Sequence, residues 1–159
     1  MRPGRPEPFR LDLRHVTLPG IYLRDFEFDA QPSFRSAFFT WADLRSSAFR
    51  GVDLTNAIFT DADMRGCLLV SAKLDEAVLS GADLRGAHLT GASLLGALLD
   101  GADLRDSQGL TAEQLSGALI DGSTRLPPEL AADAWVRARL AAMPAEATRT
   151  APAPTPRPG

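Results

Sequence analysis

Large apolar residues recur along this chain with a period of five. The first four of these centres are Leu13, Leu18, Leu23 and Phe28. One extra residue then enters between Asp29 and Pro32, after which the period resumes at Phe34 and runs without error to Leu104, giving nineteen units. The position two before each centre carries a small or modest residue, most often alanine. The chain therefore repeats one short structural unit over most of its length.

A period of five matches neither a helix nor a strand. Helical side chains return to one face every 3.6 residues and strand side chains every two, so either element would scatter the centres over different faces. We therefore expect a chain that turns once per five residues, so that four turns close a square coil of twenty residues. Such coils would stack about 4.8 Å apart around an inner column of leucine and phenylalanine.

Several units share one sequence pattern, in which Ala, Asp, an apolar centre and Arg follow one another. They are Ala42-Asp43-Leu44-Arg45-Ser46, Ala62-Asp63-Met64-Arg65-Gly66, Ala82-Asp83-Leu84-Arg85-Gly86 and Ala102-Asp103-Leu104-Arg105-Asp106. This pattern resembles that of the pentapeptide-repeat family, whose consensus is Ala, Asp or Asn, Leu and two variable residues. The resemblance covers residues 11–106, about 60% of the chain. It implies an all-β solenoid, a right-handed quadrilateral β-helix.

The ends of the repeat region predict capping elements, because a solenoid exposes unpaired coil edges. We expect residues 1–8 to be disordered, residues 9–126 to form the β-helix and the Pro/Ala-rich residues 144–159 to be a disordered tail. A short helical turn is expected near residues 110–116, where Thr111 and Gln114 have the spacing of a capping box. Residues 118–120 resemble one more repeat unit.

A C-terminal α-helix is expected over residues 127–143, with Pro128 suited to its first turn. Helical spacing places one set of side chains on a shared face: Leu130, Ala131, Ala134, Trp135, Ala138 and Ala142. This face either covers the last coil or pairs two copies of the chain. The second role is implied by the resemblance, because some family members pair through their C-terminal ends.

Outward positions twenty residues apart should stack one above another. One such face carries an acidic column beside a basic column: Asp43, Asp63, Asp83 and Asp103 next to Arg45, Arg65, Arg85 and Arg105. Like charges about 4.8 Å apart in water repel by roughly 0.9 kcal/mol per pair, and a neighbouring column of opposite sign offsets this. The face is either self-neutralising or a docking surface for a charged partner.

Another outward column is apolar and consists of Phe38, Ile58, Val78 and Leu98, with Trp41 at its corner. Contiguous exposed apolar side chains usually mark an interface. The alternative is ordinary packing between stacked rungs, which suits β-branched residues. If the column is covered, the occupant is a partner, a second subunit or the C-terminal helix.

The sequence offers few residues suited to catalysis, metal binding or disulfide formation. The net charge of −3 predicts neither a direct nucleic-acid partner nor a membrane partner. One cysteine, Cys67, excludes a disulfide framework, and His15 and His88 have no further ligand at metal spacing. No nucleophile–base arrangement or phosphate loop is evident. We expect a cytoplasmic protein that is not an enzyme and holds no cofactor.

Two functions remain. The first is a rigid scaffold that binds another protein through its flat faces. The second, implied by the family resemblance, is a DNA mimic that binds a type II topoisomerase (gyrase) and gives quinolone resistance or toxin immunity. Residues 11–105 hold thirteen acidic and nine basic residues, a weak excess for mimicry, and the arginine column spoils it further. Nineteen units also give a rod of only about 23 Å.

Overall fold

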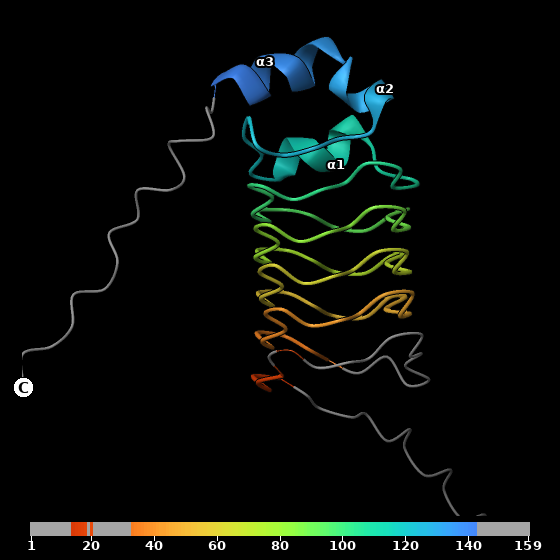
Figure 1. Ribbon diagram of the computed structural model, residues 1–159, viewed down its shortest axis with the longest axis vertical. Helices are drawn as coiled ribbons and strands as arrows, with labels where there is room; N and C mark the ends of the chain where they lie inside the picture. Colours follow the sequence, from red (N-terminus) through yellow and green to blue (C-terminus); the bar gives the residue numbers. More distant parts are fainter. Residues whose placement is uncertain (1–13, 19, 21–32, 143–159) are drawn as a thin grey trace, which may run out of the picture.

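The computed structural model describes residues 14–18, 20 and 33–142, and the segments expected to be disordered, 1–8 and 144–159, lie outside these ranges. The described chain winds into a stack of square coils, and three helices lie at its C-terminal end (Figure 1). Each coil is held to the next by isolated parallel bridges rather than by longer strands among the described residues. The sides are too short for more, because a corner follows every five residues.

Each corner is a tight turn of one form. The N–H of Ala37 donates to the carbonyl of Phe34 at 3.0 Å, and Ser36 between them has a φ of 56°. A positive φ at this position is the mark of a type II turn. Gly81 has a φ of 70°, which glycine adopts without strain, and a Cβ there would also force the carboxylate of Asp61 in the coil below to move.

The repeat centres fill the interior of the stack. Phe34, Phe39, Phe49 and Phe59 are each at most 1% exposed, and the rings of Phe39 and Phe59 stack with centroids 5.1 Å apart. Leucines and one methionine continue this column toward the C-terminus, and alanines fill the narrower positions. Each fully buried large side chain contributes about 1.5–3 kcal/mol to folding, so the column is the main source of stability.

The stacking register shifts wherever the period breaks. Phe38 pairs with Ile58 twenty residues later, but Thr17 pairs with Phe38 at a separation of twenty-one, which places the extra residue between Gly20 and Ser33. The coil also continues beyond Leu104. Leu98 pairs with Leu119 at a separation of twenty-one and Asp103 with Arg125 at twenty-two.

Helix α1, Ala112–Gly117, lies where the period ends after Leu104. Both hydrogen bonds of the expected capping box are present between Thr111 and Gln114. The side chain of Gln114 also donates to the carbonyls of Leu89 and Ala92 at 2.9 and 2.8 Å. This one amide therefore caps a helix and takes the place of the inter-coil N–H that the equivalent carbonyl of Ala72 accepts from Ser93.

The single helix expected over residues 127–143 is wrong. The chain forms α2, Pro128–Ala131, and α3, Ala134–Ala142, which are separated at residues 132–133. Asp133 causes the break, because its carboxylate accepts from the N–H groups of Trp135 and Val136 at 2.9 and 3.0 Å and so begins a new helix.

The break also changes which side chains face the coils. Val136 is fully buried, and Leu130 and Leu140 are partly buried against the core. Ala134, Trp135 and Ala138 are exposed instead of packing inward. These three residues therefore do not cover the last coil together with Leu130, because two helices with different axes cannot share the face of one helix; the alternative of a dimer contact stays a prediction.

Candidate interaction surface

The apolar column is present and runs along one side of the coils. The parallel bridges join Phe38, Ile58, Val78 and Leu98 in succession and add Leu119 as a fifth member. Phe38 is 40% exposed and Leu119 is 49% exposed, while the three members between them are half-buried. Helix α3 lies at the end of the stack (Figure 1), so it leaves this side open. We call these five residues the apolar column.

Trp41 lies at the corner next to the N-terminal end of this column. Its side chain is 69% exposed, and its backbone has a φ of 57°. A left-handed backbone costs a bulky residue about 1–2 kcal/mol, whereas glycine adopts it freely. Gly81 and Gly101 occupy the same corner in later coils. Asp61 occupies this corner with the same positive φ, so the distinguishing feature of Trp41 is its large exposed aromatic ring.

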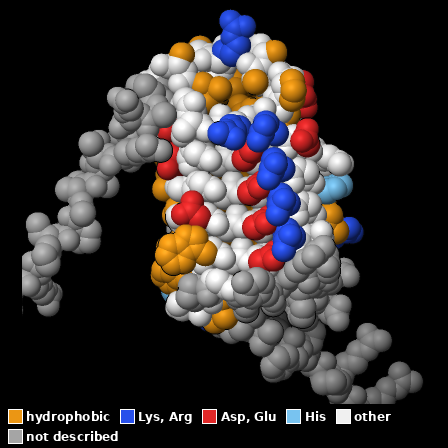
Figure 2. All heavy atoms as spheres, viewed as in Figure 1, with side chains coloured by type: hydrophobic (Ala, Val, Ile, Leu, Met, Phe, Trp, Pro, Cys, Tyr) orange, Lys and Arg blue, Asp and Glu red, His pale blue; other side chains and the backbone are white. Residues whose placement is uncertain are grey.

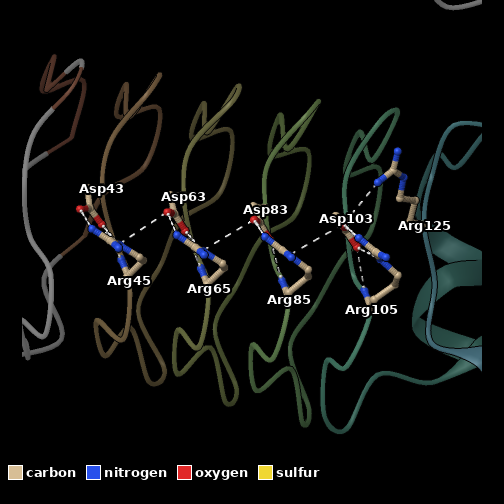
Figure 3. Close-up of polar contacts among 9 residues, drawn as sticks. All are labelled: Asp43, Arg45, Asp63, Arg65, Asp83, Arg85, Asp103, Arg105 and Arg125. Carbon is tan, nitrogen blue, oxygen red and sulfur yellow. Dashed lines mark hydrogen bonds and ion pairs between the residues drawn. The ribbon is translucent and has the colours of Figure 1, made fainter.

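The charged columns form a ladder on a neighbouring side of the coils (Figures 2 and 3). In each rung an aspartate binds the arginine two residues later. Arg85, for example, donates from Nε and Nη2 to Asp83 at 2.9 and 2.6 Å, and its backbone N–H donates to the same carboxylate at 3.2 Å. The same contacts recur for the pairs Asp43–Arg45, Asp63–Arg65 and Asp103–Arg105.

The rungs are also connected to one another. The arginine of one coil lies 3.5–3.9 Å from the aspartate of the next, as in Arg45–Asp63, Arg65–Asp83 and Arg85–Asp103. Arg125 ends the ladder 3.8 Å from Asp103. Five arginines thus face four aspartates among the described residues of this ladder, and the side-by-side columns neutralise each other as a solvated face would.

The ladder changes the acidity of its carboxylates. Hydrogen bonds from Arg85 hold the pKa of Asp83 below its usual value, although partial burial opposes this. Hydrogen bonds from Arg105 lower the pKa of Asp103 in the same way. Both carboxylates therefore stay ionised at any pH near neutrality and remain bound to their arginines.

Helix α3 carries an exposed aromatic contact near the other end of the apolar column. Arg139 donates to the carbonyl of Ala118 at 2.7 Å, and its guanidinium lies 5.4 Å from the ring centre of Trp135. Ala118 directly precedes Leu119, the last member of the column. Trp135 is 45% exposed, so a second aromatic ring lies close to the column at its C-terminal end.

Reactive chemistry is sparse in the part of the chain that the structure describes. Burial raises the pKa of the Cys67 thiol to about 12, and this thiol donates to the carbonyl of Leu44. A thiol of that acidity is not a nucleophile near neutral pH. No group of three or more His, Cys, Asp or Glu side chains in the described ranges could hold a metal ion. Nor does any helix there have the length and hydropathy needed to cross a membrane.

Two members of these surfaces were missed in the sequence, Leu119 and Arg125. Each follows an interruption of the period, so counting by twenty does not reach it. A local signal was available for both. Residues 118–120 and 124–126 each place a small or modest residue, an outward residue and an apolar residue in succession, as every repeat unit does.

Comparison with known proteins identifies the class. The pentapeptide-repeat profile matches residues 33–69 and 67–106 with eight copies. A pentapeptide repeat protein from the thylakoid lumen of Arabidopsis thaliana is 32% identical, with a TM-score of 0.62 over 65% of this chain and 71% of that one. The chain belongs to the pentapeptide-repeat family, whose members form right-handed quadrilateral β-helices.

Other solved structures extend this comparison. Rfr23, a pentapeptide repeat protein from the cyanobacterium Cyanothece 51142, is 27% identical with a TM-score of 0.63, covering 70% of this chain and 88% of that one. QnrB1, a plasmid-mediated fluoroquinolone resistance protein, is 21% identical with a TM-score of 0.34, covering 76% of this chain and 74% of that one. No curated protein matches the sequence.

Proposed function

We propose that this protein is a non-catalytic scaffold that binds another protein through the apolar column. The observation that carries the proposal is the row of apolar side chains from Phe38 to Leu119, whose two ends are 40% and 49% exposed. The rows of a stacked solenoid hold their side chains at fixed spacing, so the surface is ordered before a partner arrives. Such preorganisation lowers the entropy cost of binding.

Trp41 supports the same reading. Tryptophan is the residue most enriched among the dominant contacts of protein interfaces, and here it is held in a left-handed turn that disfavours it. A ring with no role beyond the coil would be replaced by glycine or asparagine at a gain in stability. Eight other non-glycine residues in the described ranges have a positive φ, so it is the exposure of this large ring beside the column that supports a contact with a partner.

Gyrase binding by DNA mimicry is the weaker proposal. A DNA mimic must present unpaired negative charge in rows that replace phosphates. The aspartates of the ladder are instead bound by arginines in their own coil and in the coil below. The mimic would have to use other carboxylates.

A second copy of the chain is a further candidate partner, at a different surface. Ala134, Trp135 and Ala138 form an exposed face on α3, because residues three and four apart lie on one side of a helix. A small-residue surface around one tryptophan suits close helix–helix contact. We propose this face as the place where a homodimer would form.

The scaffold proposal is tested by capturing partners with the full chain and with Phe38→Asp/Ile58→Asp. The matched control is Leu68→Asp/His88→Asp, which places the same charges on outward positions of a different face. Circular dichroism and a cooperative melt establish that all three proteins are folded. The partner is then purified and its affinity for each chain is measured by calorimetry.

The proposal expects a partner that binds the wild type and the control but is weakened at least tenfold by the column variant. Equal binding of one purified partner to all three chains would overturn the role of the column. If gyrase binds all three chains equally, DNA mimicry becomes the better explanation of the function.

A further inference from the structure

The carboxylates beside the apolar column differ from those of the ladder. Asp61 and Asp100 lie at the corner on one side of the column, and Asp75 and Glu76 lie at the corner on the other side. Asp61 and Glu76 are exposed, and Asp75 and Asp100 are half-buried. One edge of the column therefore carries carboxylates at the rungs of Ile58 and Leu98, and the other edge carries two at the rung of Val78.

These four carboxylates have no cationic partner among the described residues. Asp100 accepts only a hydroxyl, from Ser80 at 2.7 Å, and Asp75 accepts the hydroxyl of Ser93 and the N–H of Leu95. No Lys or Arg occurs in the segments that carry Ile58, Val78 and Leu98 and the corners beside them, which are residues 55–61, 75–81 and 95–101. Two arginines, Arg14 and Arg35, lie at the same corner in the coils before Thr55, and Arg35 is bound to Asp53 at 3.3 Å.

The contrast with the ladder has a physical consequence. Where the chain places aspartates in a column elsewhere, it supplies an arginine for each of them. Beside the apolar column it leaves the charge uncompensated, so the surface is an apolar strip between two negative edges. Complementarity of charge then favours a partner with an apolar stripe between positive edges.

We propose that the apolar column binds a basic amphipathic helix, one whose apolar stripe is flanked on both sides by Lys or Arg. This deepens the scaffold function proposed above and rests on it. Five rungs about 4.8 Å apart make a strip about 19 Å long. A helix of about 13 residues spans that length, and its apolar side chains repeat about every 5.4 Å, close to the spacing of the rungs. Exposed aromatic rings, Trp41 and Trp135, lie near the two ends of the strip.

The test uses two labelled 14-residue peptides and the full chain, with affinity measured by fluorescence anisotropy. One peptide has leucines at i, i+3, i+4 spacing flanked by lysine and arginine. The other is identical except that glutamate replaces every basic residue. We expect the basic peptide to bind at least tenfold more tightly, and its affinity to fall as salt is added.

Three variants locate the binding. Asp61→Asn/Glu76→Gln removes two edge charges and should weaken the basic peptide about fivefold, since exposed charge pairs contribute about 0.2–1 kcal/mol each. Asp106→Asn/Glu129→Gln removes two exposed carboxylates elsewhere and should change the affinity less than twofold. Ile58→Thr/Val78→Thr keeps the charge and the β-branched side chains but removes apolar surface, and should weaken binding at least tenfold.

Each other result overturns the inference. Equal affinity for the two peptides, binding of neither, or equal effects of the two charge-removing variants would exclude selection by edge charge. A dimer of the wild type that Ile58→Thr/Val78→Thr dissociates would assign the column to a second copy. The scaffold proposal survives the first three outcomes if a purified partner still depends on the column.

Discussion

The side-chain amide of Gln114 donates to the carbonyl of Leu89 at 2.9 Å, although the two residues are 25 positions apart in the chain. The carbonyl belongs to a coil whose next turn is replaced by helix α1. The Leu89 carbonyl also accepts the turn bond from the N–H of Ala92 at 3.0 Å. The same amide donates to the carbonyl of Ala92 at 2.8 Å, a position that in the coil before, at Ala72, accepts the N–H of the next coil.

Gln114→Ala should lower the free energy of unfolding by about 2–3 kcal/mol, because it removes both a helix cap and two donations to coil carbonyls. Gln114→Glu is the informative control. It keeps the acceptor of the capping box but cannot donate to Leu89 and Ala92, so most of the loss should remain. Urea denaturation measures both. If Gln114→Glu proved as stable as the wild type, the loss of stability in Gln114→Ala would be due to the helix cap alone.

Trp41→Asn should raise the free energy of unfolding by about 0.5–1 kcal/mol, because asparagine tolerates the left-handed backbone better than tryptophan. The same change should weaken binding of the basic peptide to the apolar column, since it removes the ring beside the column. Trp41→Phe keeps both the strain and an aromatic ring, and should change stability little. A clear loss of stability in Trp41→Asn would show that packing of the ring outweighs its strain.

The buried thiol predicts a loss of stability in alkali. The pKa of Cys67 is raised to about 12 in the folded chain, whereas an exposed cysteine titrates near 8.5. The unfolded state therefore gains from ionisation as the pH rises above about 8.5, and the free energy of unfolding should fall by about 2 kcal/mol by pH 10.

Cys67→Ala isolates this effect, because alanine is the commonest residue at the equivalent position of other repeats. Its stability should lack the cysteine-dependent decline between pH 8 and 10. In the wild type, a thiol reagent at pH 8 should label Cys67 only after unfolding. Rapid labelling of the folded chain would contradict the burial of this thiol.

The ladder predicts a loss of stability in acid. Arg85 and Arg105 lower the pKa values of Asp83 and Asp103 in the folded chain, so these carboxylates stabilise it above their unfolded pKa of about 4. That contribution is lost as the pH falls from about 4 through the lowered folded pKa. Asp83→Asn/Asp103→Asn should be less stable than the wild type at pH 7, and the difference should shrink as the pH falls below about 4. Thermal melts across this range measure it, and a pH-independent difference would contradict the ladder.

The proposed dimer face predicts that a substitution on it turns a dimer into a monomer. Sedimentation of the wild type should show a dimer, and Trp135→Asp should weaken it at least thirtyfold, since a central tryptophan contributes about 2 kcal/mol or more. Arg137→Asp introduces the same residue at another exposed position of α3 and should leave the dimer intact. A wild type that is monomeric at high concentration would exclude this face as a dimer contact.

The period of five, by itself, determined most of this protein. It predicted the coils, the buried centres and the stacking of Phe38 on Ile58 and of Asp83 on Asp103. This worked because each repeat meets the same neighbours twenty residues away, so a local pattern specifies a long-range contact. The capping box at Thr111 was readable for a similar reason, because its partners lie three residues apart.

The tertiary structure decided what happens where that rule stops. Leu119 and Arg125 join their columns only because the chain resumes coiling after α1, at separations of 21 and 22 residues. Asp133 begins a new helix after α2, and only the tertiary structure shows that this helix buries Val136 and leaves Trp135 exposed. The last coil has no successor to impose the repeat, so contacts between distant segments determine the shape there.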